Sequence, residues 1–231
     1  MQNTTNKIGT LNEKPLHEAL KQWYAQSGDR LEVPVDGSVV DIMRGELLVE
    51  IQTGNFAAIK RKLEKLIVNH PVRLVYPIPC EKWIVKLADH DKAKTSRRKS
   101  PKRGAFEQVF DELVSFPGLL MNPHFSIEML LIQEDEVRRY EGIRGWRKRG
   151  WVTYERKLLK VVGQRVLQTP ADMCSFIPAT LIEPFSTSDL AAAGPVSFRL
   201  AQKMVYCLRL MGSVTPAGKR GNAVLYIRSA T

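Results

Sequence analysis

The sequence has few of the features that mark secreted and membrane proteins. Its three cysteines, Cys80, Cys174 and Cys207, are odd in number, widely spaced and set among apolar residues, which predicts reduced core side chains. No run approaches the ~20 consecutive apolar residues of a membrane span. The polar first residues lack the apolar core of a signal peptide. We therefore expect a cytoplasmic protein that has no membrane partner.

Several catalytic motifs are also missing. The four histidines (His17, His70, His90 and His124) are scattered, and no spacing of histidine and cysteine predicts a metal site. There is no glycine-rich loop of the kind that holds phosphates in nucleotide hydrolases. Chemistry that depends on these motifs is not indicated.

Acidic residues are in short supply relative to basic ones. The chain has 35 Lys and Arg against 24 Asp and Glu, a formal net charge of +11. Apolar residues make up 44% of the chain, enough for a sizeable core. The excess of positive charge favours a polyanionic partner, most simply nucleic acid, although a solvated basic surface is the alternative.

Periodicity in the first third of the chain predicts an α/β fold with a mixed sheet. Residues 1–13 read as a flexible tail. The expected elements are a helix over 16–25, strands over 31–35, 39–43 and 47–52, a helix over 55–69 and a strand over 72–78. The second helix would cross over between parallel neighbours.

The rest of the chain predicts a link and a second domain. We expect an exposed basic loop over 88–104, a helix over 105–117 and a strand over 125–133. Helices are predicted over 153–167, 187–193 and 197–212, followed by a short β-hairpin, which is the order of a winged helix-turn-helix domain. The predicted domains are 14–142 and 143–231.

Two carboxylates in the predicted meander are candidates for a metal site. Asp41 lies on one strand, and Glu50 and Gln52 lie on the next. Residues two apart on a strand share a face, so Glu50 and Gln52 project together, and Asp41 joins them if the strands pair. Apolar neighbours on both faces indicate buried strands, in which carboxylates are costly without a cation. The alternative is the polar face of a half-exposed hairpin.

This arrangement resembles the PD-(D/E)xK nuclease superfamily, which includes restriction endonucleases. The motif would be Asp41 followed by Glu50-Ile51-Gln52, and the resemblance covers about residues 14–90. It implies a restriction-endonuclease-like mixed sheet flanked by helices. It also implies that Asp41, Glu50 and the Ile51 carbonyl bind Mg²⁺ or Mn²⁺, that Glu18 is an accessory carboxylate, and that the chain forms a homodimer.

Two positions depart from the family pattern. Gln52 stands where the family has lysine, so the charge that stabilises an attacking hydroxide is absent there. Val40 stands where a proline precedes the first aspartate. Lys60, on the following predicted helix, is a candidate source of the missing charge.

Basic side chains in three regions are predicted to contact DNA. In the loop we expect phosphate contacts from Lys92, Lys94, Arg97, Arg98, Lys99, Lys102 and Arg103, with Arg147 and Arg149 adding to them near the domain boundary. In the winged helix we expect contacts from Arg199, Gln202 and Lys203 on the long helix and from Lys219 and Arg220 at the hairpin tip.

The sequence thus favours a Mg²⁺-dependent endonuclease-like protein that binds and hydrolyses DNA, with Asp41, Glu50, Gln52 and Glu18 in catalytic roles. Gln52 keeps open a second hypothesis, a non-catalytic DNA-binding or regulatory protein with a degenerate nuclease fold. A third hypothesis is a docking subunit whose winged helix binds protein.

Overall fold

A computed structural model of the chain describes residues 14–87, 95–142 and 150–229. The predicted tail and the predicted contacts at Lys92, Lys94, Arg147 and Arg149 lie outside the described residues. The chain divides into two compact units. The β-rich unit contains residues up to 27, 77–105 and 130–164, and the mixed unit contains 28–76, 106–129 and 165–231.

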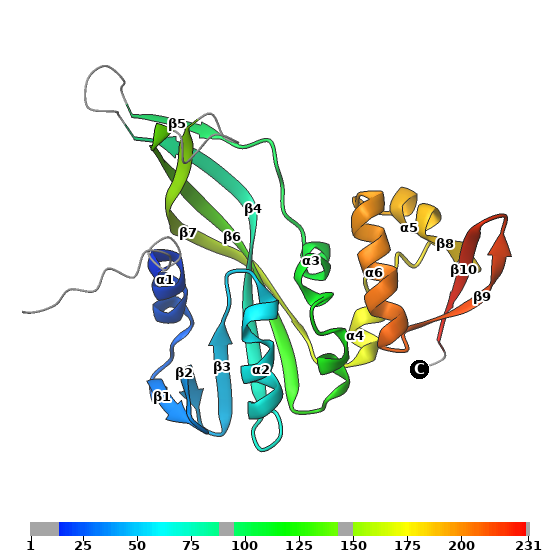
Figure 1. The fold of residues 1–231 in the computed structure, drawn as a ribbon, viewed down its shortest axis with the longest axis horizontal. Helices are drawn as coiled ribbons and strands as arrows, with labels where there is room; N and C mark the ends of the chain where they lie inside the picture. Colours follow the sequence, from blue (N-terminus) through cyan, green and yellow to red (C-terminus); the bar gives the residue numbers. More distant parts are fainter. Residues whose placement is uncertain (1–13, 88–94, 143–149, 230–231) are drawn as a thin grey trace, which may run out of the picture. The chain divides into compact units, whose positions relative to one another are not determined.

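The sheet of the mixed unit begins with an antiparallel meander, which continues into a parallel pair (Figure 1). Its elements are β1 (Arg30–Val35), β2 (Ser38–Arg44), β3 (Leu47–Ile51), α2 (Phe56–Leu66) and the start of β4 (Val72–Lys86). β3 and β4 pair in parallel. The predicted order and the crossover helix are therefore confirmed.

Local sequence explains these elements. Asp36 and Gly37 both have positive φ, which is what a tight turn between twisted strands requires. Phe56, Ile59, Leu63 and Leu66 recur at helical spacing and form the buried face of α2. Four consecutive residues of β3, from Leu48 to Ile51, are buried, so both faces of this strand are covered.

The β-rich unit contains α1 (Lys14–Tyr24), β5 (Ser96–Lys99) and most of β4, β6 (Phe125–Tyr140) and β7 (Trp151–Leu167). The strands pair in the order β1-β2-β3-β4-β6-β7, with β5 on β4. This bears out a mixed α/β class. No helix in the described ranges has the length and apolar character needed to cross a membrane.

Two predictions for this region are wrong. Residues 153–167 form strand β7, not a helix. Adjacent apolar pairs such as Leu158-Leu159 suit either element, and pairing with β6 decides for the strand, where Gly163 lies against the Leu131 side chain. Part of the predicted basic loop forms strand β5.

The end of the chain forms a small helical and β module within the mixed unit (Figure 1). Its elements are α4 (Pro170–Cys174), β8 (Phe185–Ser186), α5 (Thr187–Ala193), α6 (Phe198–Leu210), β9 (Val214–Arg220) and β10 (Ala223–Arg228). A three-stranded sheet has the order β8-β10-β9. Ser186 and Asp189 form a capping box that fixes the start of α5.

The segment between β5 and β6 is broken into short helices. They are the 3₁₀ helix η1 (Phe106–Gln108), α3 (Val109–Leu113) and the 3₁₀ helix η2 (Pro117–Met121). They belong to the mixed unit, where α6 packs against α3. The boundaries between the two compact units do not fall at the predicted domain boundary between residues 142 and 143.

Candidate functional site

The meander brings Asp41 and Glu50 together. Ile42 pairs with Val49 across β2 and β3, so the next position along the same register places Asp41 opposite Glu50. The backbone N–H of Ile51 donates to Asp41 Oδ2 at 2.8 Å. Glu50 is buried, with 3% of its surface exposed. Two carboxylates on neighbouring strands therefore lie at the end of the meander, one of them almost fully desolvated.

A lysine from α2 supplies the positive charge beside Glu50. Lys62 Nζ lies 2.5 Å from Glu50 Oε1 and donates to the carbonyl of Val39, also at 2.5 Å. Lys60, the candidate that the sequence favoured, is half-exposed and lies 3.8 Å from Glu64 instead. The sequence carried a signal for Lys62, because it lies three residues after Ile59 and next to Leu63, at the edge of the buried face of α2.

Gln52 is held by the turn between β3 and α2. Its Nε2 donates to the carbonyls of Gly54 at 2.5 Å and Asn55 at 3.3 Å. Glu112 of α3 accepts a hydrogen bond from Phe56 N at 3.1 Å, at the start of α2. The turn beside the two carboxylates is thus held by Gln52, which lies within it, and by Glu112 of α3.

The chemistry of these donors fits a hard divalent cation. In the described part of the chain, no three His, Cys, Asp or Glu side chains gather as a metal cluster. Mg²⁺ is commonly held by one or two carboxylates and keeps several of its waters, so a third protein carboxylate is not required. Asp41, Glu50 and the Ile51 carbonyl all offer oxygen ligands, and the negative charge of the buried Glu50 carboxylate favours a cation beside it.

Glu18, the predicted accessory carboxylate, belongs to the β-rich unit. It forms an ion pair with Lys21 at 2.8 Å, and this hydrogen-bonded lysine lowers the pKa of Glu18 below its usual range. The site described above is built from residues of the mixed unit alone.

The described basic residues of the predicted loop lie on and just after β5. Arg97 pairs with Asp135 at 2.9 Å, and Lys99 pairs with Glu81 at 2.8 Å. Arg103 also pairs with Glu81. Arg98, Lys102 and the other basic side chains of this segment are exposed. These cations are held at the surface, where they can meet an anion.

The predicted DNA-contacting residues of α6 divide into two groups. Arg199 and Gln202 are exposed, whereas Lys203 Nζ lies 2.7 Å from Asp111 Oδ1 of α3. At the β9–β10 hairpin, Lys219 is exposed and Arg220 pairs with Asp189 at 2.6 Å. Lys203 is thus engaged within the mixed unit, and Arg199 faces solvent.

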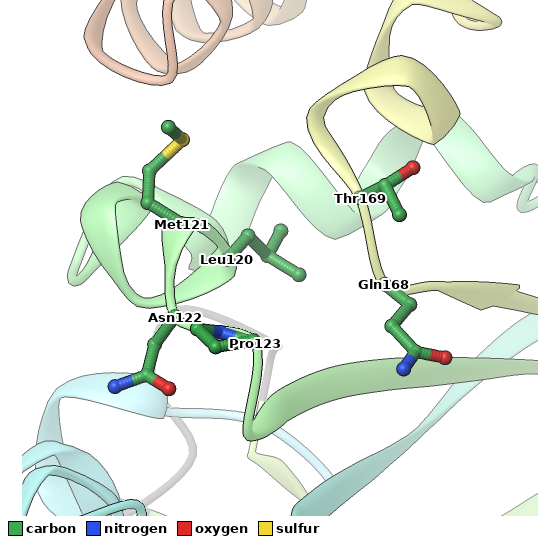
Figure 2. Close-up of a pocket in the computed structure, with 6 residues that line it drawn as sticks. All are labelled: Leu120, Met121, Asn122, Pro123, Gln168 and Thr169. Carbon is green, nitrogen blue, oxygen red and sulfur yellow. The ribbon is translucent and has the colours of Figure 1, made fainter.

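A small pocket elsewhere in the mixed unit lacks catalytic groups. It has a volume of about 240 Å³, below the ~300 Å³ of the smallest typical ligand pockets. Its lining residues, drawn in Figure 2, are Leu120, Met121, Asn122, Pro123, Gln168 and Thr169. None is ionisable, and Thr169 Oγ1 accepts a hydrogen bond from Asp172 N as the N-cap of α4. We assign no chemistry to this pocket.

Two of the three cysteines have thiols that burial makes less reactive. Burial raises the pKa of Cys207 to about 12 and also raises that of Cys80. Because the thiolate is the reactive form, these side chains remain protonated at neutral pH. The three cysteines are free; Cys207 is buried as predicted, and Cys80 and Cys174 are half-buried.

Comparison with known proteins places the chain in a family. The model of the domain of unknown function DUF8091 matches residues 14–168. The chain belongs to the DUF8091 family. Its match ends one residue after β7, so the DUF8091 region contains Asp41, Glu50, Lys62 and the basic strand β5.

Similarity to a relative continues beyond the DUF8091 region. An uncharacterized protein of Treponema pallidum (strain Nichols) is 31% identical over 221 residues, covering 95% of this chain and 86% of that protein. The module from α4 to β10 is therefore largely included in this similarity. No solved structure matches the chain.

Proposed function

We propose that this DUF8091 protein is a metal-dependent endonuclease that binds DNA and hydrolyses its phosphodiester bonds at Asp41 and Glu50. The observation that carries the proposal is the ion pair between Lys62 and the buried Glu50, opposite Asp41. The order of α1, three antiparallel strands, α2 and a parallel strand is the one that the PD-(D/E)xK resemblance implies.

Each residue has a role that follows from its position. Asp41, Glu50 and the Ile51 carbonyl would hold Mg²⁺, which polarises the phosphodiester and lowers the pKa of a bound water. Lys62 places a positive charge where negative charge develops during attack, in place of the lysine missing at position 52. With Nε2 of Gln52 bound to the turn, its Oε1 remains as an acceptor that orients the water.

The module from α4 to β10 supports a second part of the proposal. The order of the elements, a helix, a strand, two helices and a β-hairpin, is that of a winged helix. In such a domain the second helix of the pair enters the major groove. We assign duplex DNA to the exposed face of α6 with Arg199 and Gln202, and its phosphates to Lys219 and Arg220. The homodimer and the cytoplasmic location stay predictions of the sequence.

One observation favours the non-catalytic alternative. Asp41 already accepts a hydrogen bond from Ile51 N, and Gln52 is bound to the turn. Both side chains therefore stabilise the end of β3 without a metal. In that case the protein binds DNA in a salt-sensitive way and cleaves none.

Replacing Lys62 with methionine is expected to lower the rate of Mg²⁺-dependent DNA cleavage by about 100-fold, the typical effect of removing one electrostatic group from the transition state. Lys60→Met is the matched control, because Lys60 lies on the same helix but pairs with Glu64 instead of Glu50. The measurement is the rate of plasmid nicking by each purified variant, compared with that of the wild type. Equal rates for the two variants would contradict the role of Lys62.

Replacing Lys219 with alanine is expected to weaken duplex binding and to lower the slope of log affinity against log salt by about 1, the effect of losing one phosphate contact. Lys203→Ala is expected to leave that slope nearly unchanged, because Lys203 is engaged by Asp111. Fluorescence anisotropy over a salt series measures both slopes. The opposite ranking would show that the Lys203–Asp111 pair opens on DNA.

A further inference from the structure

Trp83 of the β-rich unit lies beneath two cations of the neighbouring strand. The guanidinium carbon of Arg97 lies 4.6 Å from the centroid of the Trp83 ring, and Lys99 Nζ lies 5.1 Å from it. Trp83 pairs with Lys99 across β4 and β5, and Arg97 is two residues before Lys99. The three side chains therefore share one face of the sheet.

Carboxylates hold these cations in place. Arg97 donates to Asp135 at 3.0 Å, and Lys99 donates to Glu81 at 2.8 Å. Arg103 donates to Glu81 as well. Hydrogen bonds from Lys99 and Arg103 lower the pKa of Glu81, so this carboxylate stays ionised at neutral pH. The positive groups are thus fixed beside the ring before any ligand arrives.

The arrangement leaves positive charge above an aromatic ring open to solvent. The side chain of Arg97 is 46% exposed, and its guanidinium carbon lies over the Trp83 ring. Two further rings of this unit also have a cation close by: Lys86 lies 4.4 Å from the Trp151 centroid and Arg139 lies 4.8 Å from that of Tyr154.

We propose that the Trp83 surface, formed by Trp83, Arg97, Lys99 and Arg103, binds single-stranded nucleic acid. An unpaired base stacks on the outer face of Arg97, which Trp83 supports from below. Lys99 and Arg103 contact the phosphates on either side. A duplex cannot use this surface in the same way, because its base faces are covered by the neighbouring base pairs. The proposal does not depend on cleavage at Asp41 and Glu50.

The test is the binding of a fluorescein-labelled oligothymidylate to the full-length protein in EDTA, measured by anisotropy. Trp83→Ala is expected to weaken binding by about tenfold or more, the effect of losing one stacked base. Trp83→Phe, which keeps a ring, is expected to retain most of the affinity. Trp23→Ala is the matched control, because Trp23 is 46% exposed on α1 and is not part of the Trp83 surface.

A second variant separates stacking from charge and does not alter the strand core. Arg97→Lys keeps the positive charge but removes the planar group, so weaker binding of the oligothymidylate is expected. Unchanged affinity for both Trp83→Ala and Arg97→Lys overturns the proposal. So does a matched duplex whose binding depends on Trp83 and is stronger than that of the single strand. Because EDTA prevents metal-dependent cleavage, the result is independent of the proposed nuclease activity.

Discussion

Replacing Asp41 with asparagine is expected to lower metal-dependent DNA cleavage by about a thousandfold, since a metal ligand contributes several kcal/mol to the transition state. The substitution removes the negative charge that would bind Mg²⁺. Asparagine keeps an oxygen at the same place, so it can still accept the hydrogen bond from Ile51 N that Asp41 accepts at 2.8 Å. The fold of the meander is therefore expected to survive.

This design separates catalysis from stability. Cleavage of supercoiled plasmid is measured alongside the urea midpoint of the same protein preparations. A lost rate with an unchanged midpoint is the expected pair of results. If Asp41→Asn cleaves DNA as fast as the wild type, Asp41 has only the structural role that its hydrogen bond to Ile51 shows.

Replacing Arg156 with methionine is expected to destabilise the protein by about 3 kcal/mol, the lower end of the usual cost of removing one partner from a buried charge, because Lys82 stays beside Glu134. Glu134 is fully buried. Arg156 Nε donates to Glu134 Oε2 at 2.9 Å, and Arg156 Nη2 lies 2.7 Å from the same oxygen. Lys82 Nζ remains 3.2 Å from Oε1, close enough for an ion pair but not directed for a hydrogen bond.

A neighbouring lysine gives the matched control for Arg156. Lys157 pairs with Glu155 at the surface, and its side chain is 57% exposed. Lys157→Met is expected to change the free energy of unfolding by less than about 0.5 kcal/mol. Urea titration measures both variants. A similar small effect for Arg156→Met would mean that the charged interior of this sheet does not stabilise the fold.

The same charged interior predicts a pH dependence. Burial opposes ionisation of Glu136, but hydrogen bonds from Lys82 and Arg138 outweigh it and lower its pKa to about 2. The ionised form therefore stabilises the folded state above about pH 4.5, and this contribution is lost as the pH falls from there toward 2. The stability difference between the wild type and Glu136→Gln is expected to shrink by about 3 kcal/mol over that range, as measured by urea titration.

Local patterns sufficed for the part of the fold that carries the candidate metal site. The turns at Asp36-Gly37 and Gly45, the apolar face of α2 and the buried run of β4 all agree with one another, so the meander and the crossover were predictable. The opposition of Asp41 and Glu50 followed from the turn between their strands.

Long-range pairing explains what local patterns missed. The run from Trp151 to Leu167 carries adjacent apolar residues that suit a helix, and only its pairing with β6 makes it a strand. The Trp83 surface was missed because it requires β5, four exposed residues whose composition reads as a loop. Lys62 was passed over for Lys60, since both lie on one helix and only the packing of α2 shows which one reaches Glu50.

Cleavage of a mixed DNA panel by the wild-type protein, with Mg²⁺ or Mn²⁺ and with EDTA, tests the proposed nuclease activity most directly. The panel holds plasmid, linear duplex, branched and single-stranded DNA, and Asp41→Asn and Glu50→Gln serve as blanks. We expect cutting of at least one substrate that requires the metal and is lost in both variants. Salt-sensitive binding of duplex DNA without any cleavage would contradict this expectation, and Asp41, Glu50 and Lys62 would then be a structural ion-pair cluster at the end of the meander.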